Sequence, residues 1–248
     1  MKMYLLPILF ICFTNSLFAQ QIDKSGDALL LEYYQNQRFA DALDYIKKAN
    51  PEPVTDAKVL SSLAYTSQMA GKLADAEGYY LRIYQKDSTS ISLLYNLGNL
   101  NLRRGNNGKA LVYFKKILQK DSTNFNVYKQ LATISYNIGD LKADSNYLQK
   151  ANQINPVDPD VAADLATIFI NQKLYPKADT IVSKALAADT ANLLLLHQKA
   201  IISYKLERFP QTITLCQQLI FGGAMSSDVI NMLGISYFME KRYKECIS

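Results

Sequence analysis

The sequence has few of the residues and motifs on which enzymes and metalloproteins depend. It contains one histidine, His197, and three cysteines, and it has no CxxC pair. A glycine-rich phosphate loop, a GxSxG elbow and an HExxH motif are all missing. One histidine supplies too few ligands for zinc, and no positioned nucleophile accompanies it. We therefore expect no catalytic residue, no metal site and no cofactor.

A concentration of charge of one sign is also missing. The net charge is +5, and the basic pairs lie apart along the chain as Lys47-Lys48, Arg103-Arg104 and Lys115-Lys116. Binding of nucleic acid requires basic residues gathered on one face, so we expect no nucleic-acid partner. The acidic pair Asp158 and Asp160 lies at an expected helix start, where carboxylates interact favourably with the helix dipole.

The first twenty residues differ from the rest of the chain. Lys2 gives a basic start, an apolar run extends from Tyr4 to Phe13, and small and polar residues lead to Ala19. This run is about half of the ~20 apolar residues that a membrane span requires. A cleaved signal peptide over residues 1–19 is the favoured interpretation, and an uncleaved anchor is the alternative. We expect an exported protein of the periplasm or cell envelope, with no membrane span in the mature chain.

A 34-residue repeat occupies the remainder, residues 20–248. Copies start near residues 23, 57, 91, 125, 159, 193 and 227, and the last copy is incomplete. The eighth position of the copies holds Ala64, Gly98, Ala132, Ala166, Ala200 and Gly234, and the twentieth holds Ala42, Ala76, Ala110, Asp144, Ala178, Thr212 and Cys246. A period of this length is typical of stacked helix-turn-helix hairpins, in which small residues let two antiparallel helices cross closely.

Helix signals agree with this register. Gly71, Gly105 and Gly139 fall at the expected turn between the two helices of a copy, where a left-handed residue can end the first helix. Aspartate, serine and asparagine residues recur between copies, where they can cap the incoming helix. Three departures from the pattern occur: Asp144 stands at a small buried position, Lys199 stands where leucine is usual, and Gly222-Gly223 stands at the end of a second helix.

These residues resemble the tetratricopeptide repeat (TPR) family. The third copy shows the pattern in Tyr95-Asn96-Leu97-Gly98-Asn99, Gly105-Asn106, Ala110, Phe114 and Asn124, and the resemblance extends over residues 23–248. It implies an all-α fold, a right-handed α-solenoid of about seven helix-turn-helix TPR hairpins. Within that fold Cys216 and Cys246 face the inside of their hairpins, which favours free buried thiols over a disulfide.

The resemblance also implies a non-catalytic scaffold for protein-protein interaction. In such arrays the first helices line a concave groove that binds a peptide or protein partner. The groove residues that the family pattern predicts here are Tyr65, Tyr95, Asn96, Asn99, Arg103, Lys129, Gln130, Tyr136, Asn137 and Asn171. Gln68, Thr133 and Asp164 stand at further groove positions of the same pattern. Their amides can pair with the backbone of an extended peptide, and tyrosines offer flat contact area. The alternative is that these side chains are simply solvated helix faces.

Some members of the family clamp the C-terminal carboxylate of a partner with lysine, arginine and asparagine side chains. In this chain Asp160 and Asp164 stand at positions that this mode requires, where they would repel a carboxylate. We therefore do not expect this mode of binding.

Another function remains open at this stage. Ser248 falls in the middle of the second helix expected for the seventh copy. The chain could therefore be the sensory or docking front end of a longer membrane-bound signalling or enzyme chain whose C-terminal part is absent. A module for assembly of the cell envelope is a third possibility. The sequence identifies neither the partner nor the oligomeric state.

Export gives a direct prediction. Because a basic start, a short apolar run and a small residue at Ala19 precede the repeats, mature protein from the producing cell should begin at or near Gln20. N-terminal sequencing of the secreted or periplasmic fraction measures this. Soluble cytoplasmic protein that retains Met1 would contradict it.

Overall fold

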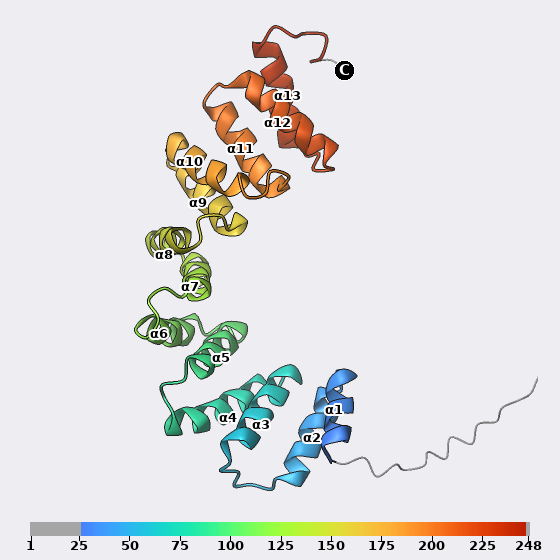
Figure 1. The fold of residues 1–248 in the computed structure, drawn as a ribbon, viewed down its shortest axis with the longest axis vertical. Helices are drawn as coiled ribbons and strands as arrows, with labels where there is room; N and C mark the ends of the chain where they lie inside the picture. The colour runs from blue at the N-terminus through green and yellow to red at the C-terminus, as the bar shows by residue number, and fades with distance from the viewer. Residues whose placement is uncertain (1–25, 247–248) are drawn as a thin grey trace, which may run out of the picture. The chain divides into compact units, whose positions relative to one another are not determined.

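The computed structural model describes residues 26–246, and this part of the chain consists of helices joined by turns, without strands (Figure 1). The predicted signal peptide, residues 1–19, and the predicted start of the first copy at Asp23 lie outside the described residues. The described residues confirm the predicted all-α fold. They form two compact units, and the boundary between Ile83 and Tyr84 lies within helix α4.

The first unit contains the N-terminal helices. They are α1 (Gly26–Gln35), α2 (Phe39–Ala49), α3 (Ala57–Met69) and the larger part of α4 (Leu73–Lys86). Leu43, Ile46, Leu60 and Leu63 are buried between them and form the core of this unit.

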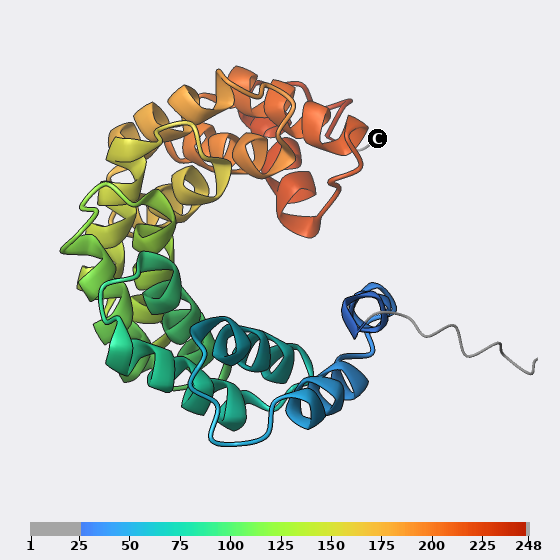
Figure 2. The same cartoon turned by 60° about the horizontal axis from the view of Figure 1, so that its bottom comes forward.

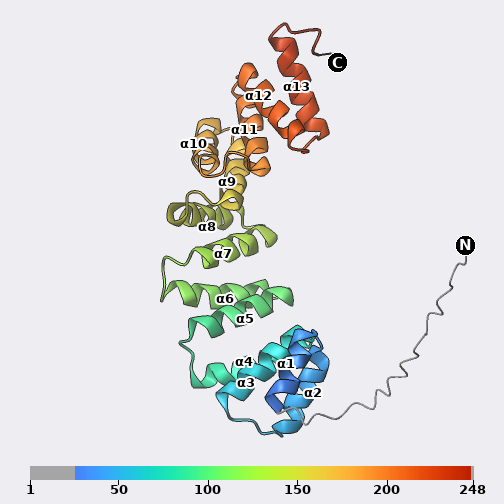
Figure 3. The ribbon, with the colours of Figure 1, turned by 45° about the vertical axis from the view of Figure 1, so that its right-hand side comes forward.

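The second unit begins with the end of α4 and continues as a stack of hairpins. Its helices are α5 (Ile91–Arg103), α6 (Asn107–Leu118), α7 (Phe125–Asn137), α8 (Leu141–Ile154), α9 (Pro159–Asn171), α10 (Tyr175–Leu186), α11 (Leu193–Lys205), α12 (Phe209–Phe221) and α13 (Ser227–Met239). Within this unit α5, α7 and α9 lie on one side, and α6, α8 and α10 lie on the other (Figures 1 and 3). Figure 2 shows these hairpins following one another along a curve.

Helix starts follow the 34-residue register. The first helices α3, α5, α7, α9, α11 and α13 begin at residues 57, 91, 125, 159, 193 and 227, where the repeat copies begin. A capping side chain precedes five of them: Asp56, Ser90, Asn124, Asp158 and Asn192 each accept a hydrogen bond from the backbone N–H three residues later. These bonds satisfy N–H groups that have no partner inside the helix.

The turn within each hairpin also keeps the register. One residue there takes a left-handed conformation, with φ between 55° and 79°, at Gln37, Gly71, Gly105, Gly139, Lys173, Glu207 and Lys241. The glycine prediction for the turns at residues 71, 105 and 139 is therefore confirmed. The other four hairpins place larger residues in a backbone conformation that side chains disfavour.

Small residues lie where the helices of a hairpin cross. Ala42, Ala76, Ala110 and Ala178 are fully buried, as expected for the twentieth position. At the eighth position the ring of Phe114 leaves room only for glycine at residue 98, because an added Cβ would lie 2.8 Å from that ring. Close helix packing therefore depends on the residue pairs that the repeat aligns.

The departure at Lys199 is compensated in the structure. Its buried ammonium group donates hydrogen bonds to Asp179 Oδ1 at 2.5 Å and to Ser183 Oγ at 2.6 Å on α10. Arg208 adds a bond to Asp179 Oδ2 at 3.0 Å. Burial raises the pKa of the Asp179 carboxyl, but the bonds from Lys199 and Arg208 outweigh it and hold the pKa below its ordinary value. A lysine in a leucine position is tolerated because its charge is paired.

The left-handed turn yields a prediction on stability. An added Cβ at Gly105 meets no atom within 4 Å, so Gly105→Ala tests the backbone conformation alone. We expect it to lower the free energy of unfolding by about 1 kcal/mol, and Lys173→Gly to raise it by up to about 1 kcal/mol. Urea denaturation followed by circular dichroism measures both changes.

Gly78 is the matched control, because it lies within α4 at ordinary helical φ and also has no atom near its Cβ direction. Gly78→Ala should raise stability by about 0.5–1 kcal/mol. Equal effects of alanine at residues 78 and 105 would contradict the role assigned to the turn.

Candidate functional site

The predicted groove residues lie on first helices, as the register requires. Tyr65 is on α3 of the first unit and is not placed relative to the others. The second unit carries the rest: Tyr95, Asn96, Asn99 and Arg103 on α5, Lys129, Gln130, Tyr136 and Asn137 on α7, and Asn171 at the end of α9. Asn96, Arg103, Tyr136, Asn137 and Asn171 are exposed, whereas Tyr95, Asn99, Lys129 and Gln130 are half-buried.

The amide side chains of this set are unused. Asn96, Asn99, Gln130, Asn137 and Asn171 make no side-chain hydrogen bond with any residue that the structure describes. Amides at other positions do form such bonds, for example in the helix caps. The unbonded donors and acceptors of these exposed and half-buried amides on α5, α7 and α9 are therefore available to a ligand.

Two of the predicted tyrosines also have packing roles. The ring of Tyr95 meets Phe114 edge-on, with ring centroids 5.6 Å apart, within the buried cluster of α5, α6 and α7. In the first unit the ring of Tyr65 similarly meets the ring of Tyr34 edge-on, with ring centroids 6.2 Å apart. Because their rings support the hairpins, only part of each side chain is available for contact with a partner.

Lys129 is engaged in ion pairs. Its ammonium group lies 3.3 Å from Asp158 Oδ1 and 3.1 Å from Asp160 Oδ2 at the start of α9. Burial lowers the pKa of Lys129, but the bond to Asp160 and the charge of Asp158 outweigh it and raise the pKa above its ordinary value. The sequence did not predict this pairing, which joins two consecutive first helices.

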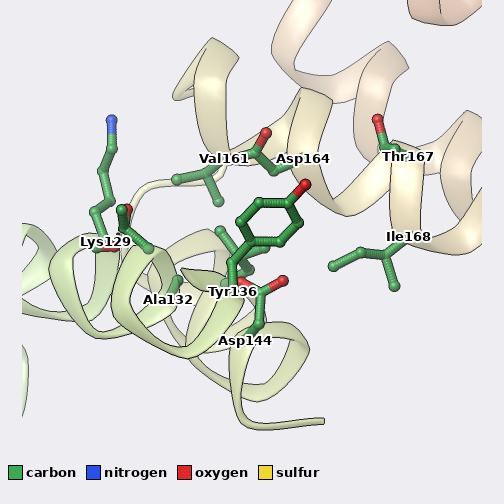
Figure 4. Close-up of a pocket in the computed structure, with 10 residues that line it drawn as sticks. Lys129, Ala132, Tyr136, Asp144, Val161, Asp164, Thr167 and Ile168 are labelled. Carbon is green, nitrogen blue, oxygen red and sulfur yellow. Dashed lines mark hydrogen bonds between the residues drawn. The ribbon is translucent and has the colours of Figure 1, made fainter. Parts of the chain in front are cut away.

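A cavity of about 360 Å³ lies beside Lys129, between α7, α8 and α9. It is lined by Lys129, Ala132, Thr133, Tyr136, Asp144, Leu148, Val161, Asp164, Thr167 and Ile168 (Figure 4). Of the residues at predicted groove positions, the structure brings together Lys129, Thr133, Tyr136 and Asp164 here, and the others lie outside its wall. The cavity combines apolar walls with a few converging polar groups, which is the usual composition of a ligand site.

Asp144 is the unusual member of this wall. It is 6% exposed, and its carboxylate makes no hydrogen bond or ion pair with any residue in the described range. In Figure 4 its side chain points toward the space beneath the ring of Tyr136. Burial raises the pKa of Asp144, and the nearby negative charge of Asp164 raises it further. A carboxylate in the first turn of a helix gains about 0.3–1 kcal/mol from the dipole, which offsets only part of the cost of burial.

Asp164 supplies the second carboxylate from α9. Burial raises its pKa, and the charge of Asp160 raises it further, although Lys129 acts in the opposite direction. Tyr136, 66% exposed, adds an aromatic ring and a hydroxyl group at the side of the cavity. The two carboxylates of the wall, Asp144 and the exposed Asp164, together with Asp158 and Asp160 beside Lys129, outnumber that one lysine, so the formal charge around the cavity is negative.

The family pattern selected Asp164 as a groove position, but it did not select Asp144 or Thr167 as site residues. The available signal was the departure at Asp144, where the other copies keep alanine, threonine or cysteine. In the described residues no group of three or more histidine, cysteine, aspartate or glutamate side chains is arranged to hold a metal ion. None of the helices between residues 26 and 246 is long and apolar enough to cross a membrane.

The two cysteines in the part of the chain that the structure describes, Cys216 and Cys246, are free thiols. Cys216 is buried in the core of α11, α12 and α13, and Cys246 donates a hydrogen bond from Sγ to the carbonyl oxygen of Gly234 at 2.9 Å. Burial, with a contribution from the charge of Asp228, raises the pKa of Cys216 to about 11. A thiol with so high a pKa is a poor nucleophile, so Cys216 acts as a small apolar core residue.

Comparison with solved structures identifies the fold. A TPR protein from Parabacteroides merdae is 18% identical, with a TM-score of 0.62 over 77% of this chain and 76% of that one. The C-terminal part of a TPR repeat-containing protein from Cytophaga hutchinsonii is 16% identical, with a TM-score of 0.68 over 88% and 87%. YrrB, described as a TPR protein with an unusual peptide-binding site, is 18% identical, with a TM-score of 0.56 over 79% and 97%.

These similarities show that the chain has the fold of TPR proteins, as the repeat pattern predicted. No protein-family model matches the sequence. A search of curated proteins also finds no significant match. The fold is therefore established by structure, and the function must be argued from the residues.

The unpaired carboxylate at Asp144 gives a prediction on stability. Asp144→Ala should raise the free energy of unfolding by about 0.5–2 kcal/mol, because it restores the small residue of the other copies and removes a buried charge. Since the folded protein holds the pKa of Asp144 above its ordinary value, the penalty grows as pH rises through about 4 and persists at neutral pH. The gain should thus be larger at pH 7 than at pH 4, as measured by urea denaturation.

Asp179 provides the contrasting control, because its carboxylate is bonded to Lys199 and Arg208. Asp179→Ala should lower stability, since it leaves the buried Lys199 without its partner. A loss of stability in Asp144→Ala would show that this carboxylate has a native partner after all.

Proposed function

We propose that this chain is an exported, non-catalytic scaffold that binds an extended segment of a partner protein along α5, α7 and α9. The observation that carries the proposal is the row of unbonded amides at Asn96, Asn99 and Asn137, exposed at residues 96 and 137 and half-buried at residue 99, beside Tyr136. An extended peptide leaves its backbone N–H and C=O groups unpaired, and amide side chains can satisfy both kinds of group. We call the exposed side of α5, α7 and α9 the first-helix surface.

Rigid support favours this surface as the binding site. Each of its helices is capped, packed on a second helix and held by buried apolar side chains such as Leu97, Leu131 and Leu165. A preformed surface loses little conformational entropy on binding, which improves affinity. The peptide-binding site described for YrrB is a precedent for such a function on this fold.

Export is part of the proposal and rests on the sequence of residues 1–19. It places the scaffold in the periplasm or cell envelope, where its partner would be another exported or envelope protein. Binding there would require no cofactor, metal or nucleic acid.

A paired substitution tests the proposed surface. Asn99→Ala with Arg103→Ala removes a half-buried amide and an exposed cation from α5. It should lower the affinity for a partner recovered with the mature protein by about tenfold, because hydrogen-bond partners and contact area are lost. Stability should change by only about 0.5 kcal/mol per exposed position. Biolayer interferometry with the recovered partner measures the affinity.

The control lies on the second helices. Lys115 on α6 and Lys150 on α8 are exposed, so Lys115→Ala with Lys150→Ala should leave affinity unchanged apart from a salt-sensitive association rate. Lys116 is unsuitable, because its ammonium group donates to the hydroxyl of Tyr84 at 2.6 Å. If the lysine pair abolishes binding and the α5 pair does not, the second helices carry the site.

A further inference from the structure

The repeat array contains two charged residues at positions that normally hold a small or apolar side chain, and the structure treats them differently. Lys199 is fully paired with Asp179 and Ser183. Asp144 as a whole residue is just as buried, but its carboxylate faces the cavity and has no partner among the described residues. An unpaired buried carboxylate costs stability, and such costs persist in proteins chiefly where they serve a function.

The surroundings of Asp144 indicate what would satisfy it. The only cation in the wall of the cavity is Lys129, whose ammonium group is already bonded to Asp158 and Asp160. Asp164 adds a second carboxylate from the facing helix α9. The site therefore has acceptors for at least one more positive charge, and no described side chain supplies it.

The remaining walls match the stem of a long side chain. Ala132, Leu148, Val161 and Ile168 present apolar surface around the cavity. Methylene groups of lysine or arginine bury well against such surface while the charged head reaches polar groups. The ring of Tyr136 stands over the space toward which Asp144 points, where it can stack on a cation (Figure 4).

We propose that this cavity receives a lysine or arginine side chain from the segment bound on the first-helix surface. The proposal rests on the proposed function and specifies the chemistry of the partner: a basic segment whose cationic side chain bonds Asp144 and Asp164. The buried carboxylate is specific to the hairpin of α7 and α8, because the other copies place alanine, threonine or cysteine where Asp144 stands. It therefore sets the register of a bound peptide at one point along the array.

Simple peptides test this inference without knowledge of the natural partner. The probe is an acetylated and amidated peptide of eight glycine and serine residues with one central arginine. Matched peptides carry lysine, glutamate or citrulline, the uncharged isostere of arginine, at the same place. Saturation-transfer NMR titration against the mature protein gives the affinity of each peptide, and one buried side chain predicts a dissociation constant of about 0.1–10 mM.

We expect the arginine and lysine peptides to bind at least about tenfold more tightly than the citrulline and glutamate peptides. Asp144→Asn with Asp164→Asn should abolish that preference while the protein stays folded, because these changes remove charge and keep volume. The control Asp44→Asn with Asp75→Asn removes the same charge from exposed positions of the first unit, and it should leave the preference intact.

Equal binding of the arginine and citrulline peptides, a preference that survives the double asparagine variant, or no detectable binding by any peptide at about 10 mM would overturn the inference. The proposed function is tested separately, by the partner and the α5 substitutions. If the affinity for the partner falls in the Asn99 and Arg103 variant but is unchanged in the Asp144 and Asp164 variant, the scaffold function is supported and the binding of a cationic side chain in the cavity is contradicted.

Discussion

Close approach of two helices within each hairpin is the constraint on which the rest of the structure depends. The chain must reverse in a few residues, so one residue at the turn takes a left-handed conformation in every copy from Gln37 to Lys241. The helices can then cross only where small side chains stand, as at Ala110 and Ala178. Because both requirements recur every 34 residues, the caps and the surface positions are also held in register. A surface row of amides on α5, α7 and α9 is a consequence of that spacing.

The same constraint makes Asp144 informative. A carboxylate at a crossing position cannot move freely into water, and in this hairpin it borders a cavity instead of a packed neighbour. Lys199 shows that the array tolerates a charged residue when the neighbouring helix α10 provides an opposite charge. The contrast between these two residues is the basis of the proposal that a cationic side chain binds at Asp144.

Most of the fold could be predicted from the sequence because it depends on local, repeated requirements. The starts of the first helices at residues 57–227 and the glycine turns at 71, 105 and 139 followed directly from the period. The division within α4 and the pairing of Lys129 with Asp158 and Asp160 did not, since they depend on how side chains from different copies meet. The cavity was signalled only indirectly, by the misplaced Asp144, because the family pattern describes positions that copies share and not their exceptions.

We propose that the first-helix surface binds a partner segment and that the cavity of α7, α8 and α9 holds one of its cationic side chains. A crystal structure of the mature protein with the arginine peptide would show both. We expect density for a guanidinium group between the carboxylates of Asp144 and Asp164, with the peptide backbone lying along α7 and α9. An empty cavity at saturating peptide, or a peptide bound on the side of α8 and α10 near Gln149 and Lys177, would contradict it.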